Sequence, residues 1–379
     1  DYTLPKGKRP TVTSVVDKSL CISQMDNGIL YWRIDGRMDA DATKQFVIDL
    51  ADDATSPTTV MGIKEAAKNL IVTDNGKNVF QYNIAMPRLP AGVGREFARN
   101  GFIHPAWSPA GNQLTNAMTD DHAHHFGIWN PWTHVDYDGK HYDLWNLGDK
   151  TGTVLLDTLY STRQGDLFAD ITVGHAHLIF QPQAEQTINT VESIIKITPK
   201  KRIKIMDETL SMRVWNVNPD KEGFLWDFIS DLKPATDLPV LLTAYRYAGF
   251  GWRATADWTK ENCVMVTSEG KQRPEIDGTN ARWIYVTGAS PKGRSGILFM
   301  GYPENRKFPE PLRIWDQNQN GGRGDAFVNF APTKNEDWTL EPHKTYRLRY
   351  RMLMFDGDIT PTQAEDIWQD FAKPVKVSF

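Results

Sequence analysis

Three long segments of this chain alternate apolar residues with polar or small ones, and this pattern limits the folds that the chain can adopt. The segments cover residues 167–180, 187–197 and 201–217, and the letters "TPKK" mark a turn between the last two. A period of two residues is typical of β-strands with one buried face. Three such strands joined by short turns predict an antiparallel meander.

Shorter segments rich in β-branched and aromatic residues, bounded by Gly, Pro, Asn or Asp, predict further strands. They cover residues 11–23, 45–50, 79–85, 153–160, 224–232, 240–245, 263–267, 282–287, 296–301 and 344–355. Only two helices are predicted. The first is one or two turns at residues 63–69, "IKEAAKN", and the second is residues 361–372, with Thr360 as its cap and Pro361 in its first turn.

So many strands predict an all-β fold, an antiparallel β-sandwich of two large packed sheets with a short C-terminal helix. No internal repeat and no low-complexity linker divides the chain. We therefore expect one large sandwich domain over residues 1–379. The strands of residues 1–75 would pack on it, and residues 360–372 would hold the terminal helix against a sheet.

Charge and composition exclude several classes of partner. The net charge is -4, with 43 Lys and Arg against 47 Asp and Glu, and no long basic run suggests nucleic-acid binding. No window approaches the roughly 20 apolar residues of a membrane-spanning helix.

The chain begins at Asp1 without an initiator Met, so we expect a removed signal peptide and an extracytoplasmic (periplasmic or secreted) location. Cys21 and Cys263 are too few for a disulfide framework, and free thiols are favoured over a single bridge.

Aromatic residues make up 11% of the chain, including 13 Trp. Many of them belong to the core of any all-β protein. The other interpretation is sugar binding, because an indole ring packs well against the C–H face of a pyranose.

The chain has no G-x-S-x-G elbow, phosphate-binding loop, H-E-x-x-H helix or dinucleotide fingerprint, which disfavours serine hydrolase, nucleotide and nicotinamide chemistry.

The stretch "TDDHAHHFGIW", residues 119–129, concentrates imidazoles and carboxylates. If it is a strand, His122 and His124 share one face, while Asp121 and His125 share the other. Such a pair of histidines could act as a general acid and base, or could ligate a divalent metal. The alternative is a polar network that orders loops.

Other candidates lie on either side of this cluster. His104, in the Pro/Gly-rich "GFIHPAWSPAG", could fold over the cluster as a further catalytic or ligating group. Downstream, "AYRYAGFGWR" carries Tyr247, Trp252 and Arg253, and "EPLRIWD" carries Arg313; arginine can clamp a carboxylate or sugar hydroxyls. A bulged strand with a cation-π stack explains the first motif equally well. Asp227, in the apolar "LWDFISD", is either a substrate-binding acid or half of a structural ion pair.

The blocks "RNGFIHPAWSPAGNQLTN" and "DDHAHHFGIWNPWTHVDYDGKHYDLWN", followed by "YRYAGFGWR" and "YPENRKFPEPLRIW", resemble the bacterial family called PmoA-like. The likeness spans residues 80–357. The name suggests methane oxygenase, an activity that needs a membrane-embedded enzyme, so we interpret the name as a misannotation. What the resemblance implies is a sugar-related protein with a galactose-mutarotase-like supersandwich. Phe126 departs from the pattern, since an Arg is common there. The positions carried over are His104, Asp121, His122, His124, His125, Trp129, Arg253 and Arg313.

These observations predict an enzyme that cleaves or modifies an oligosaccharide or polysaccharide, by hydrolysis or by elimination. His122 or His124 would move the proton, with Asp121 orienting an imidazole and His104 and His125 nearby. Hydrolysis needs two facing carboxylates, and the sequence offers no convincing pair. The rival hypotheses are a non-catalytic carbohydrate-binding protein and a mutarotase-type sugar epimerase. The residues expected to bind substrate are Trp129, Trp132, Tyr247, Trp252, Arg253, Arg313 and Asp227.

Overall fold

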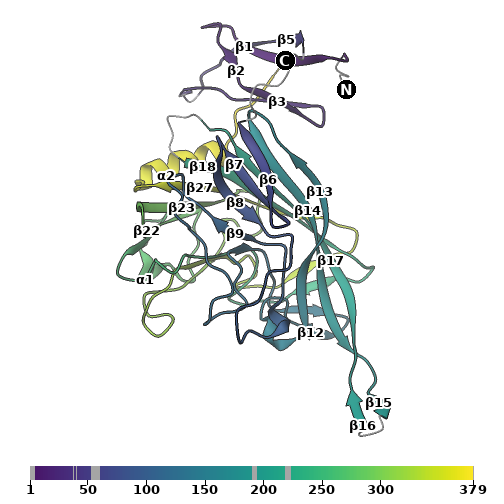
Figure 1. Ribbon diagram of the computed structural model, residues 1–379. Helices are drawn as coiled ribbons and strands as arrows, with labels where there is room; N and C mark the ends of the chain where they lie inside the picture. The colour runs from purple at the N-terminus through teal and green to yellow at the C-terminus, as the bar shows by residue number, and fades with distance from the viewer. Residues whose placement is uncertain are drawn as a thin grey trace.

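Two large antiparallel sheets form the body of the protein (Figure 1). The computed structural model describes residues 5–36, 38–39, 41–52, 60–189, 194–217 and 223–378. In spatial order, the first sheet consists of β24 (Leu312–Ile314), β25 (Phe327–Phe330), β20 (Gly251–Arg253), β10 (Ile128–Trp129), β9 (Ile103–Ala106), β8 (Lys77–Tyr82), β7 (Asn69–Asp74) and β6 (Met61–Ala66). The second consists of β13 (Gly152–Arg163), β14 (Phe168–Pro182), β17 (Lys200–Trp215), β18 (Gly223–Pro234), β27 (Tyr346–Asp356), β23 (Gly293–Gly301), β22 (Trp283–Ser290) and β21 (Cys263–Thr267).

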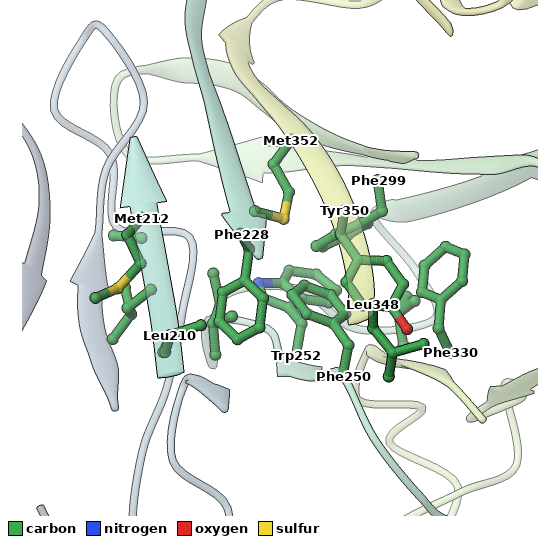
Figure 2. Packing of buried hydrophobic residues seen from close by; sticks show 14 of the residues in the cluster. Leu210, Met212, Phe228, Phe250, Trp252, Phe299, Phe330, Leu348, Tyr350 and Met352 are labelled. Atoms are coloured by element: carbon green, nitrogen blue, oxygen red, sulfur yellow. The ribbon is translucent and has the colours of Figure 1, made fainter. Parts of the chain in front are cut away.

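The core lies between these sheets, where their apolar faces meet. Along β27, Leu348, Tyr350, Met352 and Met354 are buried and alternate with more exposed residues, as a half-buried strand requires. Aromatic rings cross the interface, as in the Phe80–Trp226 pair, whose centroids are 4.8 Å apart. Figure 2 shows the same packing where Phe250 and Trp252 meet Phe228, Phe299 and Tyr350. The predicted antiparallel β-sandwich is confirmed.

Smaller elements complete the fold. A four-stranded sheet comprises β12 (Lys140–Tyr142), β11 (Val135–Tyr137), β19 (Val240–Leu242) and β26 (Trp338–Leu340). The N-terminal strands are β2 (Leu20–Cys21), β1 (Lys8–Ser14) and β5 (Phe46–Asp52), with a hairpin of β3 (Ser23–Asp26) and β4 (Ile29–Trp32). The short helical turns are η1 (Arg95–Phe97), η2 (Leu147–Asp149) and α1 (Arg273–Ile276).

The hairpin β3–β4 ties the N-terminal strands to the second sheet. Asp26 pairs with Arg213 at 2.8 Å, and the Gln24 side-chain oxygen accepts hydrogen bonds from the backbone N–H groups of Leu167 and Phe168. That residues 1–379 are a single domain stays a prediction. Cys21 and Cys263 are both free thiols, as predicted.

The C-terminal helix α2 (Pro361–Ala372) has the predicted bounds. Thr360 accepts a hydrogen bond from the Gln363 N–H, and the Gln363 side chain returns one, which forms a capping box. Trp368 is buried, and its indole N–H donates to the Gly301 carbonyl at 3.0 Å, which fixes the helix on the end of β23. No helix among the described residues has the length and apolar character needed to cross a membrane.

Three of the predicted elements are wrong. Residues 11–23 are not one strand, because β1 ends at Ser14 and Val12 pairs with Cys21 of β2 across a turn. Residues 63–69 form part of the β6–β7 hairpin instead of a helix, because Ile63 pairs with Val72, which lies in the core. Residues 187–197 are not one strand of the meander. β14 pairs directly with β17, from Phe168 opposite Trp215 to Pro182 opposite Lys200. β15 (Gln186–Asn189) and β16 (Ile194–Ile197) form a hairpin that projects from the end of this ribbon, and residues 190–193 lie outside the described part (Figure 1).

Candidate active site

The histidine cluster lies in the loop between β9 and β10, and this loop is not a strand. The Ala117–Phe126 bridge and the bond from the Met118 N–H to the His125 carbonyl close the loop. Inside it, the His122 N–H donates to the Thr119 carbonyl at 3.0 Å, and the His125 N–H donates to the His122 carbonyl at 3.0 Å. These are successive tight turns, so the predicted alternation of faces is wrong.

The tight turns bring all three imidazoles together. His122 and His125 stack with ring centroids 4.7 Å apart, and His124 meets them edge-on, at 5.4 Å from His122 and 4.8 Å from His125. Trp315, which follows β24, covers His122 at 4.7 Å. The sequence therefore identified the cluster correctly but assigned its geometry wrongly.

Asp121 orients one imidazole of this cluster. Its Oδ2 lies 2.8 Å from His122 Nδ1 and 3.1 Å from the Arg253 guanidinium. Partial burial opposes ionisation, yet the Thr119 hydroxyl, the Arg253 charge and His122 hold the pKa of Asp121 well below its usual range. An ionised carboxylate only accepts hydrogen bonds, so Nδ1 of His122 must donate, and Nε2 of the neutral ring is left as a proton acceptor.

His122 faces a cavity of ≈ 220 Å³. Loops form its walls. Some of these loops follow strands of the first sheet, and the others lead into or out of the four-stranded sheet. The lining residues are His122, His124, His125, Thr133, Trp145, Asn146, Tyr245, Arg246, Tyr247 and Trp315. None of these described residues is an aspartate or a glutamate.

The neighbouring imidazoles are uncharged at neutral pH. Burial, together with the charge of Arg253, lowers the pKa of His124 to about 4, and burial lowers the pKa of His125 well below its ordinary value. His104 is not part of the cavity wall, although it was predicted beside the cluster. Its Nδ1 lies 2.9 Å from the Thr115 hydroxyl, and burial lowers its pKa to about 4.

Three tryptophans predicted to stack on sugar belong to the core instead. Trp129, Trp132 and Trp252 are at most 2% exposed. Trp129 lies beneath His125 at 5.3 Å, so it supports the site without reaching the cavity. Residue type alone does not separate a core indole from a ligand-facing one, and the cavity uses Trp145 and Trp315.

The predicted substrate-binding arginines are also occupied. Arg253 bridges Asp121 and Asp325, the latter at 2.7 Å, and is 3% exposed. Arg313 forms an ion pair with Asp277 at 2.9 Å and lies behind Tyr247. Both therefore hold the wall of the site in place and do not line the cavity.

Asp227 lies at another place in the molecule. It forms an ion pair with Arg351 at 2.6 Å, and it lines a separate cavity of ≈ 480 Å³ beside the hairpin β3–β4. Most of the charged groups there are paired with each other, as Arg213 is with Asp170. The structural ion pair is thus the correct interpretation of Asp227.

Tyr247 is the predicted binding residue that does reach the cavity. Its hydroxyl oxygen accepts hydrogen bonds from Arg313 at 2.9 Å and from the Trp315 indole N–H at 3.0 Å. Because both neighbours are donors, the hydroxyl proton of Tyr247 remains available for donation. Tyr247 could therefore protonate a group bound in the cavity.

The site does not show a metal-ligand arrangement. Among the residues that the structure describes, no group of three or more His, Cys, Asp or Glu side chains is placed to hold a metal ion. The suggested pair, His122 and His124, meets edge-on, and His122 uses Nδ1 on Asp121.

Several lining residues were missed as site residues. Tyr245 and Arg246 belong to the "AYRYAGFGWR" motif, but the motif gave no reason to choose Arg246 over Arg253. Trp145 and Asn146 carry no signal of their own, because their place beside the histidines is set only by the path of the chain.

Fold and site together define an antiparallel β-sandwich protein with an imidazole-lined cavity. The model described as "Family of unknown function (DUF6807)" matches residues 69–369, and the chain belongs to that family. The assignment to PmoA-like proteins was wrong, since the matching family is DUF6807. No curated protein matches the chain in sequence.

Similar solved structures include two carbohydrate-related proteins. Heparan sulfate lyase HepC from Pedobacter heparinus aligns over 79% of this chain and 35% of its own, with 9% identity and a TM-score of 0.33. A galactose mutarotase related enzyme from Lactobacillus acidophilus aligns over 79% of this chain and 99% of its own, with 9% identity and a TM-score of 0.35. The chain thus spans about a third of the length of the lyase.

Proposed function

We propose that this protein is a carbohydrate-active enzyme that cleaves its substrate by elimination, with His122 as the base. The observation that carries the proposal is the Asp121–His122 pair beside a cavity whose described lining residues include no carboxylic acid. An imidazole whose Nδ1 donates to a carboxylate can use its Nε2 to accept a proton. Trp145, Tyr245 and Trp315 supply ring faces, and Thr133 and Asn146 supply polar atoms, a combination suited to a sugar.

Elimination fits the cavity better than hydrolysis does. A glycoside hydrolase of the common kind needs one protonated and one ionised carboxyl group on either side of the bond. Asp121 is the carboxylate nearest to the imidazoles, and it is held ionised by Arg253 and His122. It therefore cannot serve as the proton donor.

The proposed step uses two residues of the wall. His122 Nε2 removes a proton from a carbon next to a carboxylate or ketone of the sugar. The electron pair left on that carbon forms a C=C bond, and the C–O bond on the adjacent carbon breaks. Tyr247 donates its hydroxyl proton to the departing oxygen, and proton exchange with solvent then restores Tyr247 and His122.

A screen of oligosaccharides with product mass spectrometry tests this function. Uronate-containing and oxidised, keto-sugar substrates should yield fragments whose masses sum to that of the substrate, with one fragment unsaturated. His122→Ala should lower kcat by about 10²–10⁴-fold, the usual contribution of a general base, while ligand binding persists. His141→Ala is the matched control, because His141 is exposed, lies outside the cavity and also pairs with an aspartate, Asp136.

The other outcomes identify the rivals. Fragments that have gained water would indicate hydrolysis, and an isomer of unchanged mass would indicate an epimerase. Wild-type protein that binds oligosaccharides without converting them would be a non-catalytic carbohydrate-binding protein, and each of these results would contradict elimination.

A further inference from the structure

We propose that the substrate is anionic, a uronate-containing saccharide whose carboxylate is bound by Arg246 at one edge of the cavity. This inference rests on the proposed function and goes further, because elimination alone is compatible with either a uronate or a neutral keto-sugar. The distinction depends on where charge lies around the cavity.

Arg246 is the only lysine or arginine among the described residues that line the cavity. Its side chain is exposed, and no ion pair or hydrogen bond of its guanidinium is recorded within the described part of the chain. It lies beside the rings of Tyr245 and Tyr247, with its guanidinium carbon 5.9 Å and 5.4 Å from their centroids. These aromatic contacts leave its N–H groups for a ligand.

Two further cations lie behind Arg246 and share one carboxylate. Asp277 forms ion pairs with Arg313 at 2.9 Å and with Lys334 at 3.7 Å. Burial lowers the pKa of Lys334, and the positive charges of Arg313 and Arg246 act in the same direction, against the attraction of Asp277. Within the described part of the chain, this edge of the site therefore carries more positive charge than its carboxylate partner, Asp277, can balance.

The opposite wall adds little charge. His124 and His125 are neutral because burial lowers their pKa values. Asp121 and Asp325 share Arg253, and Asp325 also pairs with Arg323, so two carboxylates are balanced by two guanidinium groups. The chain as a whole carries a net charge of -4, so the positive edge is a local feature. A local cation in a partly enclosed site attracts an anion more strongly than one on an open surface.

The same placement suits the chemistry. When the base removes the proton next to a carboxylate, negative charge moves onto the carboxylate oxygens. A guanidinium can hold those oxygens with two parallel hydrogen bonds and stabilise the added charge. A keto-sugar carries no charge until its enolate forms, whereas a uronate is already an anion when it binds, so the excess of cations favours the uronate.

The test compares a uronate oligosaccharide with its methyl ester, which differs by one methyl group and carries no charge. We expect the wild type to prefer the acid and to lose that preference as salt is raised. Arg246→Gln should raise KM for the acid at least about ten-fold more than for the ester, the scale of one charge-assisted hydrogen bond. Arg202→Gln is the control, since Arg202 is an exposed arginine over an aromatic ring, Phe180, outside the cavity.

Calorimetry of the acid and the ester binding to the His122→Ala variant separates this inference from the proposed function. This variant should still bind the saccharide while it loses most of its turnover. Equal turnover of acid and ester, an unchanged KM in Arg246→Gln, or elimination from keto-sugars alone would overturn the uronate assignment and leave elimination standing. Arg246-dependent binding of the acid with no elimination by the wild type would instead overturn the proposed function and keep the anion site.

Discussion

Glu310 is a buried acid that has no cationic partner among the residues that the structure describes. It is 1% exposed, its Oε1 accepts a hydrogen bond from the Tyr350 hydroxyl at 3.0 Å, and its Oε2 has no partner among the described residues. Burial raises its pKa to about 8, and the hydrogen bonds from Tyr350 and Asn305 only partly oppose this. The folded protein therefore keeps Glu310 protonated at neutral pH.

Glu310→Gln should make the stability of the protein less sensitive to alkali. The folded state holds a proton that the unfolded chain releases near pH 4.5. The stabilisation from Glu310 is thus complete below that pH and is lost as pH rises toward 8. The loss amounts to at most about 5 kcal/mol, at 1.36 kcal/mol per pKa unit. Urea unfolding at pH 5, 7 and 9 measures it, and an equal slope in wild type and variant would contradict it. Glu341→Gln, at an exposed glutamate, should leave the slope unchanged.

At this scale the sequence predicts the chemistry better than the position. The density of imidazoles in residues 119–129 pointed to a segment that lines the cavity. It could not show that Trp129 lies under the cavity while Trp145 lines it, or that Arg253 is bound by two carboxylates while Arg246 is not. Those differences depend on contacts between residues far apart in the chain.

The β6–β7 hairpin turns through an unfavourable pair of residues. Ala67 and Lys68 both have positive φ angles, 48° and 65°, between the paired residues Ala66 and Asn69. The next hairpin, β7–β8, turns through Asn75 and Gly76, the preferred pair for this type of turn. Residues with a Cβ are strained at positive φ, and glycine is not.

Replacing Ala67 and Lys68 by Asn and Gly should raise the free energy of unfolding by about 1 kcal/mol, because the strain in the turn is relieved. Gly76→Ala in the neighbouring turn is the reciprocal control and should lower it by a similar amount. Denaturant unfolding measures both. A neutral or destabilising effect of the double substitution would show that the turn is not strained.

The same hairpin shows where prediction of elements fails. "IKEAAKN" contains good helix formers, but Ile63 and Val72 gain more from burial between the sheets than the segment gains from local helix propensity. In contrast, helix α2 was predicted to the residue, because its cap at Thr360 and Pro361 is a local signal. Residues 187–197 have the period of a strand, and a period does not reveal where a hairpin turns.

A buried polar network links the two large sheets across the core. Glu208 of β17 accepts hydrogen bonds from Ser230 at 2.5 Å and from Asn130 at 2.7 Å, and lies 2.8 Å from His175 Nδ1. His175 Nε2 lies 2.6 Å from the hydroxyl of Tyr82 on β8, in the first sheet. Burial opposes the charge of Glu208, yet the hydrogen bonds of His175 and of nearby His177 hold its pKa well below the usual range.

Glu208→Gln should lower the free energy of unfolding by about 3–5 kcal/mol, the cost of removing one member of a buried charged network. Because the folded pKa of Glu208 is depressed, its stabilisation is present above about pH 4.5 and is lost as pH falls below that value. The wild type should therefore lose stability on acidification more steeply than the variant. Asp207→Asn, at a half-exposed carboxylate on the same strand, should change stability by less than about 0.5 kcal/mol. Thermal and urea unfolding between pH 3 and 7 distinguish these results.

The indoles that surround the histidine cluster give the molecule a natural optical label. Trp315 and Trp145 form part of the cavity wall. The centroid of the Trp315 ring lies 4.7 Å from the centroid of the His122 ring and 4.6 Å from the guanidinium carbon of Arg253. A guest entering the cavity must displace water from both rings and change the field that their excited states experience. Its arrival can therefore be followed in real time by intrinsic emission, with no dye attached and no turnover required.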